Sequence, residues 1–132
     1  QIYEILEDKI ELKMIQTEIQ VIGFSGCNFI YTDKKRMQQV LLNLLSNAIK
    51  FTDRGGSIQI QAIKEPSKMV TLYVRDSGIG IKKEDQSKLF KMFGSIKDSK
   101  RKFNTQGIGL GLVISRMIVQ KFGGEIKFKS KY

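Results

Sequence analysis

The sequence predicts one domain that combines α-helices with β-strands, and three features of its 132 residues lead to this prediction. Apolar residues recur in several segments at the spacing of an amphipathic helix. Other segments alternate apolar and polar residues, as half-buried strands do. The apolar share of 41% is enough for one sizeable core in a chain of this length. We therefore expect a single α/β domain over residues 1–132.

The expected helices and strands follow from these two periodicities. Helical spacing predicts helices over residues 1–15, from residue 33 to the turn DRGG at 53–56, over 83–93, and from 110 to the glycine pair at 123–124. Alternation predicts strands over residues 17–24, 57–64, 69–76 and 125–131. The first strand is expected at a sheet edge, and the next two form a hairpin. The polar segment 94–107 is expected to be a loop.

The composition excludes several classes of protein. The chain has no histidine and a single cysteine, Cys27, so it can form neither an internal disulfide framework nor the usual zinc sites and Ser-His or Cys-His catalytic pairs. It contains no apolar run of about 20 residues that could span a bilayer. Its acidic start is unlike a signal peptide. We expect a soluble fragment of a longer protein.

The net charge of +10 needs an explanation in terms of partners. Eight basic and three acidic residues between Lys82 and Lys102 supply half of it. A basic face can bind nucleic acid, an acidic membrane or a ligand that bears phosphate. A solvated lysine-rich surface is the alternative.

The stretch LLNLLSNAIKF (41–51) places polar side chains on one edge of an otherwise apolar helix. In helical projection Arg36, Gln39, Asn43, Asn47 and Lys50 fall within an arc of roughly 80°. The carbonyl oxygen of asparagine is an uncharged ligand suited to a magnesium ion that phosphate already neutralises, and lysine adds a positive charge for phosphate. This helix alone leaves a merely solvated edge as the alternative.

The motif VRDSGIGI (74–81) puts Asp76 at the end of a predicted strand and follows it with Gly78 and Gly80. A carboxylate there can accept a hydrogen bond from an exocyclic amine, while glycines let the backbone approach a flat ring. A simple turn at the end of a hairpin would also explain the glycines.

The motif QGIGLGL (106–112) places three glycines, Gly107, Gly109 and Gly111, at the start of a helix. Amide groups at a helix start can bind phosphate. The motif matches neither the dinucleotide fingerprint nor a P-loop, so it indicates a different nucleotide fold.

In chain order, RMQQVLLNLLSNAIKFT (36–52), VRDSGIGI (74–81), KLFKMF (88–93) and QGIGLGL (106–112) resemble four boxes of one family. They are similar to the N box, first glycine box, F box and second glycine box of the catalytic, ATP-binding domain of sensor histidine kinases. The resemblance covers about residues 33–130. It implies the Bergerat fold, a two-layer α/β sandwich with helices packed on one face of a mixed sheet. It also implies a mobile ATP lid at about residues 94–106.

The resemblance implies roles for individual residues around Mg²⁺ and ATP. Asn47 matches the magnesium ligand, Asn43 its support one turn earlier, and Lys50 the lysine that contacts phosphate. With Arg101 of the lid, these three are the expected catalytic residues. The expected nucleotide-binding residues are Asn43, Asn47, Lys50, Phe51, Asp76, Gly78, Gly80, Ile81, Phe93, Gln106, Gly107, Ile108, Gly109, Leu110 and Gly111. Phe90 and Phe93 match the F-box aromatics, for which plain core packing is the alternative.

The resemblance favours phosphotransfer over hydrolysis. Gyrase-like ATPases and the heat-shock chaperone carry a water-activating glutamate where this chain has Asn43, and an asparagine has no carboxylate to accept a proton. In the lid, Arg101 and Lys102, which lie near Ser99, are candidates to contact the γ-phosphate. Asn104 and Gln106 replace the glycine-rich entry of many relatives.

The absence of histidine means that the phosphate acceptor of the family must lie on a separate helical dimerisation domain. We expect the fragment to be monomeric and the parent kinase to be a homodimer, with a response-regulator receiver domain as partner. We expect a cytoplasmic location, and neither nucleic-acid binding nor membrane insertion by the fragment. A degenerate module of the same fold that senses nucleotide or serves as a scaffold, without phosphotransfer, is the alternative function. A serine or mitochondrial-type kinase of this fold fits the wording of the boxes less well.

Overall fold

The long helix α2 (Lys34–Phe51) organises the first part of the chain. In the computed structural model the described residues are 2–24, 30–67, 69–91 and 110–132. They belong to two compact units, Gln1–Ile79 and Gly80–Tyr132. Asp33 caps the start of α2, because its Oδ1 accepts a hydrogen bond of 3.0 Å from the backbone N–H of Arg36. The helix predicted from residue 33 is confirmed.

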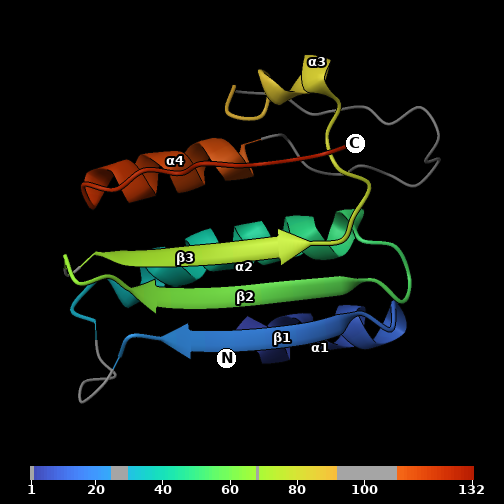
Figure 1. Cartoon of the computed structure of the whole chain (residues 1–132), viewed down its shortest axis with the longest axis horizontal. Helices are drawn as coiled ribbons and strands as arrows, with labels where there is room; N and C mark the ends of the chain where they lie inside the picture. The colour runs from blue at the N-terminus through green and yellow to red at the C-terminus, as the bar shows by residue number, and fades with distance from the viewer. Residues whose placement is uncertain (1, 25–29, 68, 92–109) are drawn as a thin grey trace. The chain divides into compact units, whose positions relative to one another are not determined.

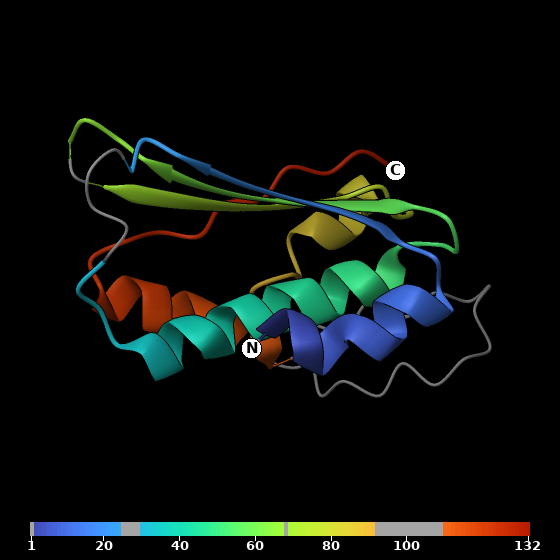
Figure 2. The same cartoon turned by 90° about the horizontal axis from the view of Figure 1, so that it is seen from below.

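The first unit is a two-layer α/β arrangement, as predicted. Its other elements are α1 (Ile2–Leu12), β1 (Gln16–Ile22), β2 (Ser57–Lys64) and β3 (Val70–Asp76). Figure 1 shows the three strands side by side, and Figure 2 shows α1 and α2 lying together along one face of their sheet. The strand predicted at 17–24 and the hairpin at 57–76 are therefore confirmed, with small shifts at their ends.

The sheet is mixed and has the order β1-β2-β3. Strands β1 and β2 run parallel, whereas β2 and β3 are antiparallel. The register pairs Thr17 with Ile58 and Ile58 with Asp76, so these three side chains lie on one side of the sheet. The opposite face carries Glu18, Gln59 and other polar residues.

The core of this unit lies between the sheet and the two helices. Its buried members are Leu6, Ile10, Ile15, Leu45, Ala48, Ile49 and Ile58. Ile58 on the central strand is 2% exposed and is the largest fully buried side chain among the described residues. The helix residues of this core belong to the apolar pattern that predicted the helices, although Ile5 of the same pattern is 65% exposed.

Helix α1 ends earlier than the predicted residue 15, in a Schellman motif. The N–H of Ile15 bonds to the carbonyl of Ile10 (3.0 Å), and that of Met14 bonds to Glu11 (2.8 Å). Met14 has a φ of +52°, a conformation for which glycine is the usual residue. The sequence did not predict the end of α1, because a methionine occupies the position where a glycine would indicate that a helix ends.

The second unit contains α3 (Lys83–Gln86) and α4 (Gly111–Lys121). The helix predicted at 83–93 is wrong in length, because only its first four residues are helical and single turns follow as far as the structure describes the segment. A hydrogen bond of 2.7 Å from the Lys88 ammonium to Asp85 Oδ1 raises the pKa of Lys88. The helix predicted after residue 110 is confirmed.

The strand predicted at 125–131 is not formed. Alternation favours an extended segment, but a strand also needs a partner with which to form a backbone ladder. Here side chains make the contacts: Ser130 Oγ accepts a bond of 2.9 Å from the N–H of Ile81, and Gln86 Nε2 lies 3.5 Å from the carbonyl of Ser130. No helix in the described ranges is long and apolar enough to cross a membrane.

We predict that Ile58→Ala lowers the free energy of unfolding by about 2–5 kcal/mol, because truncation leaves a cavity in the core. Ile19→Ala is the control on the same side of the sheet. Its side chain is 59% exposed, so the loss should be below about 1 kcal/mol. Urea denaturation measures both variants. Equal losses would show that Ile58 does not occupy the centre of the core.

Candidate functional site

Helix α2 brings three of the predicted site residues onto one edge. Because the helix continues without a break from Lys34 to Phe51, Asn43, Asn47 and Lys50 follow one another at intervals of four and three residues. All three side chains are partly exposed. The Lys50 ammonium lies 5.3 Å from the centre of the Phe51 ring. This edge therefore presents two amides and one cation, and the cation lies close to an aromatic ring.

The start of the first glycine box lies against the carboxyl end of α2. The N–H of Ile79 points to the carbonyl oxygen of Phe51 at 3.4 Å. A Cβ atom on Gly78 would lie 2.6 Å from the same carbonyl oxygen. This distance is too short for any side chain at position 78. Glycine is required at position 78 because the backbone of Phe51 occupies that space.

Asp76 ends β3 with an exposed carboxylate. Its Oδ1 accepts a hydrogen bond of 2.9 Å from the N–H of Gly78. Among the described residues no donor contacts the other oxygen, Oδ2, so it is available to accept a hydrogen bond from a ligand. The first unit thus brings Phe51 together with Asp76 and Gly78, which follow it in the sequence by 25 and 27 residues.

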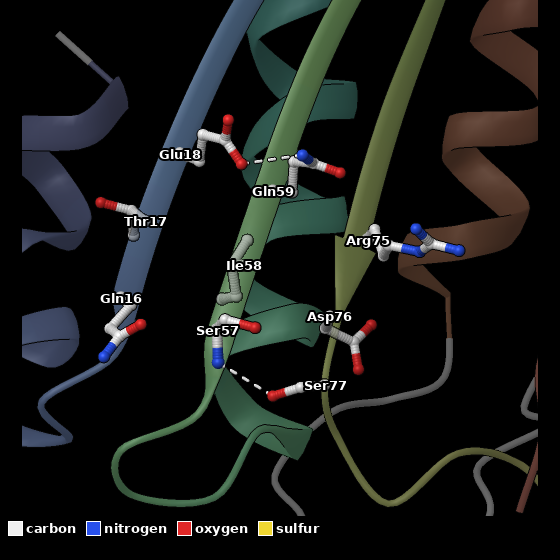
Figure 3. A pocket seen from close by; sticks show the side chains of 9 residues that line it. All are labelled: Gln16, Thr17, Glu18, Ser57, Ile58, Gln59, Arg75, Asp76 and Ser77. Carbon is white, nitrogen blue, oxygen red and sulfur yellow. Dashed lines mark hydrogen bonds between the residues drawn. The ribbon is translucent and has the colours of Figure 1, made fainter.

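A hollow of about 520 Å³ lies at the end of the sheet where β1 and β2 begin and β3 ends (Figure 3). Its lining residues are Gln16, Thr17, Glu18, Ser57, Ile58, Gln59, Arg75, Asp76 and Ser77. Inside it Glu18 accepts a bond of 2.8 Å from Gln59, so both side chains already have partners. Among the described residues predicted to bind nucleotide, only Asp76 lines this hollow.

Ser77 is a site-forming residue that sequence reasoning missed. Its Oγ accepts a bond of 2.8 Å from the N–H of Ser57, and its own N–H donates to the carbonyl of Ser57 at 3.0 Å. These two bonds fasten the chain directly after Asp76 to the start of β2. A serine that follows the aspartate at a strand end is a weak signal, and it does not reveal the partner.

The second unit holds the remaining described site residues. A Cβ atom on Gly80 would collide with the carbonyl oxygen of Lys131, and its φ of +70° also requires glycine. Ile81 follows, with its N–H bonded to Ser130 and its carbonyl bonded to Gln86 Nε2 at 3.0 Å. The sequence predicted no role for Ser130 or Gln86.

Leu110 and Gly111 stand at the start of α4, as the sequence predicts. The F-box residue Phe90 packs within this unit. Its ring centre lies 5.9 Å from the ring centre of Phe128. The Arg116 guanidinium lies 5.4 Å from the centre of the Phe90 ring. This position agrees with the packing alternative for Phe90.

Several predicted residues lie outside the described part of the chain. They are Phe93, Arg101, Gln106, Gly107, Ile108 and Gly109, together with the lid at about 94–106. Their roles stay predictions. No three histidine, cysteine, aspartate or glutamate side chains form a metal-binding group within the described ranges.

The comparison with known proteins identifies the class. Residues 32–132 match the family described as "Histidine kinase-, DNA gyrase B-, and HSP90-like ATPase". The chain belongs to this family of ATPases. Its fold is also that of solved histidine kinase catalytic domains. The nucleotide-free catalytic domain of histidine kinase ThkA is 31% identical with a TM-score of 0.69, over 92% of this chain and 74% of that one.

Two other relatives show the kind of protein in which this domain occurs. Hybrid signal transduction histidine kinase B of Dictyostelium discoideum is 37% identical over 92% of this chain but only 7% of its own length. The circadian input-output histidine kinase CikA of Synechococcus elongatus is 34% identical over 95% of this chain and 16% of its own. The chain therefore spans a small part of each of these kinases.

We predict that Gly78→Ala lowers the free energy of unfolding by about 1–3 kcal/mol, because the added methyl group would push against the Phe51 carbonyl. The control is Gly124→Ala, where the nearest atom is a Val119 methyl at 3.1 Å that can move. It should cost less than about 1 kcal/mol in the same urea denaturation. A Gly78→Ala variant as stable as the wild type would contradict the close approach of residues 51 and 78.

Proposed function

We propose that this chain is the Mg-ATP-binding catalytic domain of a sensor histidine kinase, of the simple or the hybrid type. It would donate the γ-phosphate of ATP to a histidine on a separate helical domain in two-component signal transduction. The observation that carries the proposal is the junction of β3 with α2, where Asp76, Gly78 and Phe51 meet in a member of this ATPase family. In this proposal both units form one nucleotide-binding domain with a lid at about 94–106.

The proposed nucleotide contacts use the groups that the first unit leaves available. Oδ2 of Asp76 would accept from the adenine amine, while Oδ1 remains bonded to the N–H of Gly78. Phe51 would lie beside the base. Gly80, Ile81, Leu110, Gly111 and the predicted residues outside the described part of the chain would complete the site.

The edge of α2 fits a magnesium ion held mainly by phosphate oxygens and water. Asn47 would supply a neutral carbonyl ligand, with Asn43 as its neighbour one turn away. Lys50 would compensate phosphate charge. Bound magnesium would lower the electrostatic cost of charge that develops during phosphoryl transfer.

Phosphotransfer rather than hydrolysis suits the residues of α2. A hydrolase of this family needs a carboxylate to take a proton from water, and position 43 has an amide instead. ATP would be positioned while an acceptor approaches in line. Since the chain has no histidine, the acceptor must be supplied by another domain.

The proposed partners are that histidine-bearing dimerisation domain and a response-regulator receiver domain, on the cytoplasmic side of the cell. Histidine kinase ThkA, a 27% identical structural relative, was solved in complex with the response regulator TrrA. ShkA, 28% identical with a TM-score of 0.73 over 92% of this chain and 24% of that one, was solved with AMPPNP. We propose that this chain is a monomer without its dimerisation domain, and that the parent kinase is a homodimer.

We predict that Asp76→Asn weakens binding of AMPPNP at least about tenfold, because the new amide N–H group would face the adenine amine and leave two donors without an acceptor. The side-chain oxygen of the new asparagine can still accept from the N–H of Gly78, so the turn at residues 76–78 is preserved. The position of Oδ2, which is an acceptor in Asp76, is taken by an NH₂ donor. Glu18→Gln is the matched control, since it makes the same change on the opposite face of the sheet. Calorimetric titration with and without magnesium measures both variants. Equal affinity of Asp76→Asn and wild type would overturn the assignment of Asp76.

We also predict acid-labile phosphate on a histidine-bearing helical dimerisation domain mixed with this chain and Mg-ATP, and none on the chain alone. Asn47→Ala should abolish the transfer by removing the magnesium ligand. Radiolabel retained after alkali but lost after acid is the measurement. Binding of ATP without any transfer would favour the nucleotide-sensing alternative.

A further inference from the structure

Lys13 makes a cluster of hydrogen bonds that none of the predicted roles uses. It directly follows α1, and its ammonium group reaches the carboxyl end of α2. There Nζ donates to the carbonyl oxygens of Ile49 at 2.6 Å, Lys50 at 3.1 Å and Thr52 at 2.8 Å. An ammonium group has three N–H donors, so these carbonyls match its full capacity.

These bonds complete the pairing of the backbone carbonyls at the end of α2. A helix leaves its last four carbonyls without partners inside the helix. Here the carbonyl of Ala48 accepts from the N–H of Thr52 at 2.9 Å, and that of Phe51 faces the N–H of Ile79 at 3.4 Å. Lys13 takes the carbonyls on both sides of Phe51. The Phe51 carbonyl is not bonded by Lys13 and faces the N–H of Ile79 in the first glycine box.

The backbone at Lys13 and just after it holds the residue in this position. Its own carbonyl accepts from the N–H of Gly55 at 2.9 Å, and the N–H of Gln16 donates to the carbonyl of Gly56 at 2.8 Å. The left-handed turn at Met14 redirects the chain from α1 into β1 at this point. The turn after α1 and the turn after α2 therefore form one hydrogen-bonded unit.

The charge of Lys13 suits this place. The carboxyl end of a helix carries a partial negative charge, and a cation there is stabilising. The bonds are partly buried, so replacement of the ammonium by an apolar group would leave carbonyl oxygens without partners where water reaches them poorly. The peptides around Phe51 would then keep the bond from Thr52 to Ala48 and the contact with Ile79 but lose the contacts that Lys13 makes with the carbonyls of Ile49, Lys50 and Thr52.

We propose that Lys13 is a positioning residue of the nucleotide site, acting through the end of α2. It fixes the peptides on either side of Phe51, which sets the place of the Phe51 ring, of Lys50 and of the carbonyl against which Gly78 packs. Lys13 itself contacts no nucleotide. It precedes residues 32–132, which the family match covers. The inference rests on the proposed function, because it assumes that ATP binds beside Phe51.

The test compares four variants by calorimetric titration with AMPPNP and magnesium. Lys13→Met removes the three donors and keeps the apolar stem. Lys9→Met makes the same change one turn earlier, at an exposed position of α1. Leu6→Ala removes a buried core side chain of α1 and controls for lost stability, at a temperature where circular dichroism shows it folded. Lys13→Arg keeps the charge and donors. Lys13→Gln replaces Lys13→Met if the latter does not fold.

We expect Lys13→Met to weaken nucleotide binding about fivefold or more, the size of a weak coupling between sites. Lys9→Met and Leu6→Ala should stay within about twofold of the wild type, and Lys13→Arg should recover part of the lost affinity. In the nucleotide-free protein, the NMR amide signal of Ile79 should shift in Lys13→Met but not in Lys9→Met.

Two results would overturn the inference: wild-type affinity in Lys13→Met, or an equal loss in Leu6→Ala, which would show a general effect of stability. An unchanged Ile79 amide in Lys13→Met would contradict the link between the ammonium and the glycine box. Failure of the proposed function has a different outcome, since the wild type itself would then not bind AMPPNP.

Discussion

The burial of one side of β2 against α1 and α2 is the constraint on which the first unit depends. Ile58 is fixed in the core, and the register pairs it with Asp76 on β3. A slip of one residue would move every side chain of that strand to the other face. Asp76 would then lie with Glu18 on the polar side of the sheet, away from α2. The packing of an apolar core thus decides where the candidate ligand-binding carboxylate stands.

The second constraint is the satisfaction of backbone polar groups at the carboxyl end of α2. The carbonyls there find partners in three other parts of the unit: the turn after α1, the helix's own following residue and the start of the glycine box. The Lys13 ammonium and two backbone N–H groups thus hold the carbonyls at this junction. It joins the amide edge of α2 to the aspartate of β3 without a side chain of either motif having to make the connection.

The sequence predicted α2 and the hairpin well because their signals are local and strong. An apolar residue every three or four positions and a clear alternation determine which face is buried. It failed at residues 125–131 because a strand depends on a neighbouring backbone that no pattern within the segment reveals. The prediction also made the first helix too long, because Met14 takes a left-handed conformation in which glycine is the usual residue.

By itself the sequence determined the kinds of chemical group that the candidate site has available. The amides at positions 43 and 47, the lysine at 50 and the aspartate followed by glycine at 76–78 are set by residue type and short spacing. The tertiary structure alone decided what holds those groups in place. The bonds of Lys13 join residues 36 to 39 positions apart, and that from Ile81 to Ser130 spans 49. Contacts across such separations depend on how the chain folds back, because the identity of a lysine or a serine carries no signal of its distant partner.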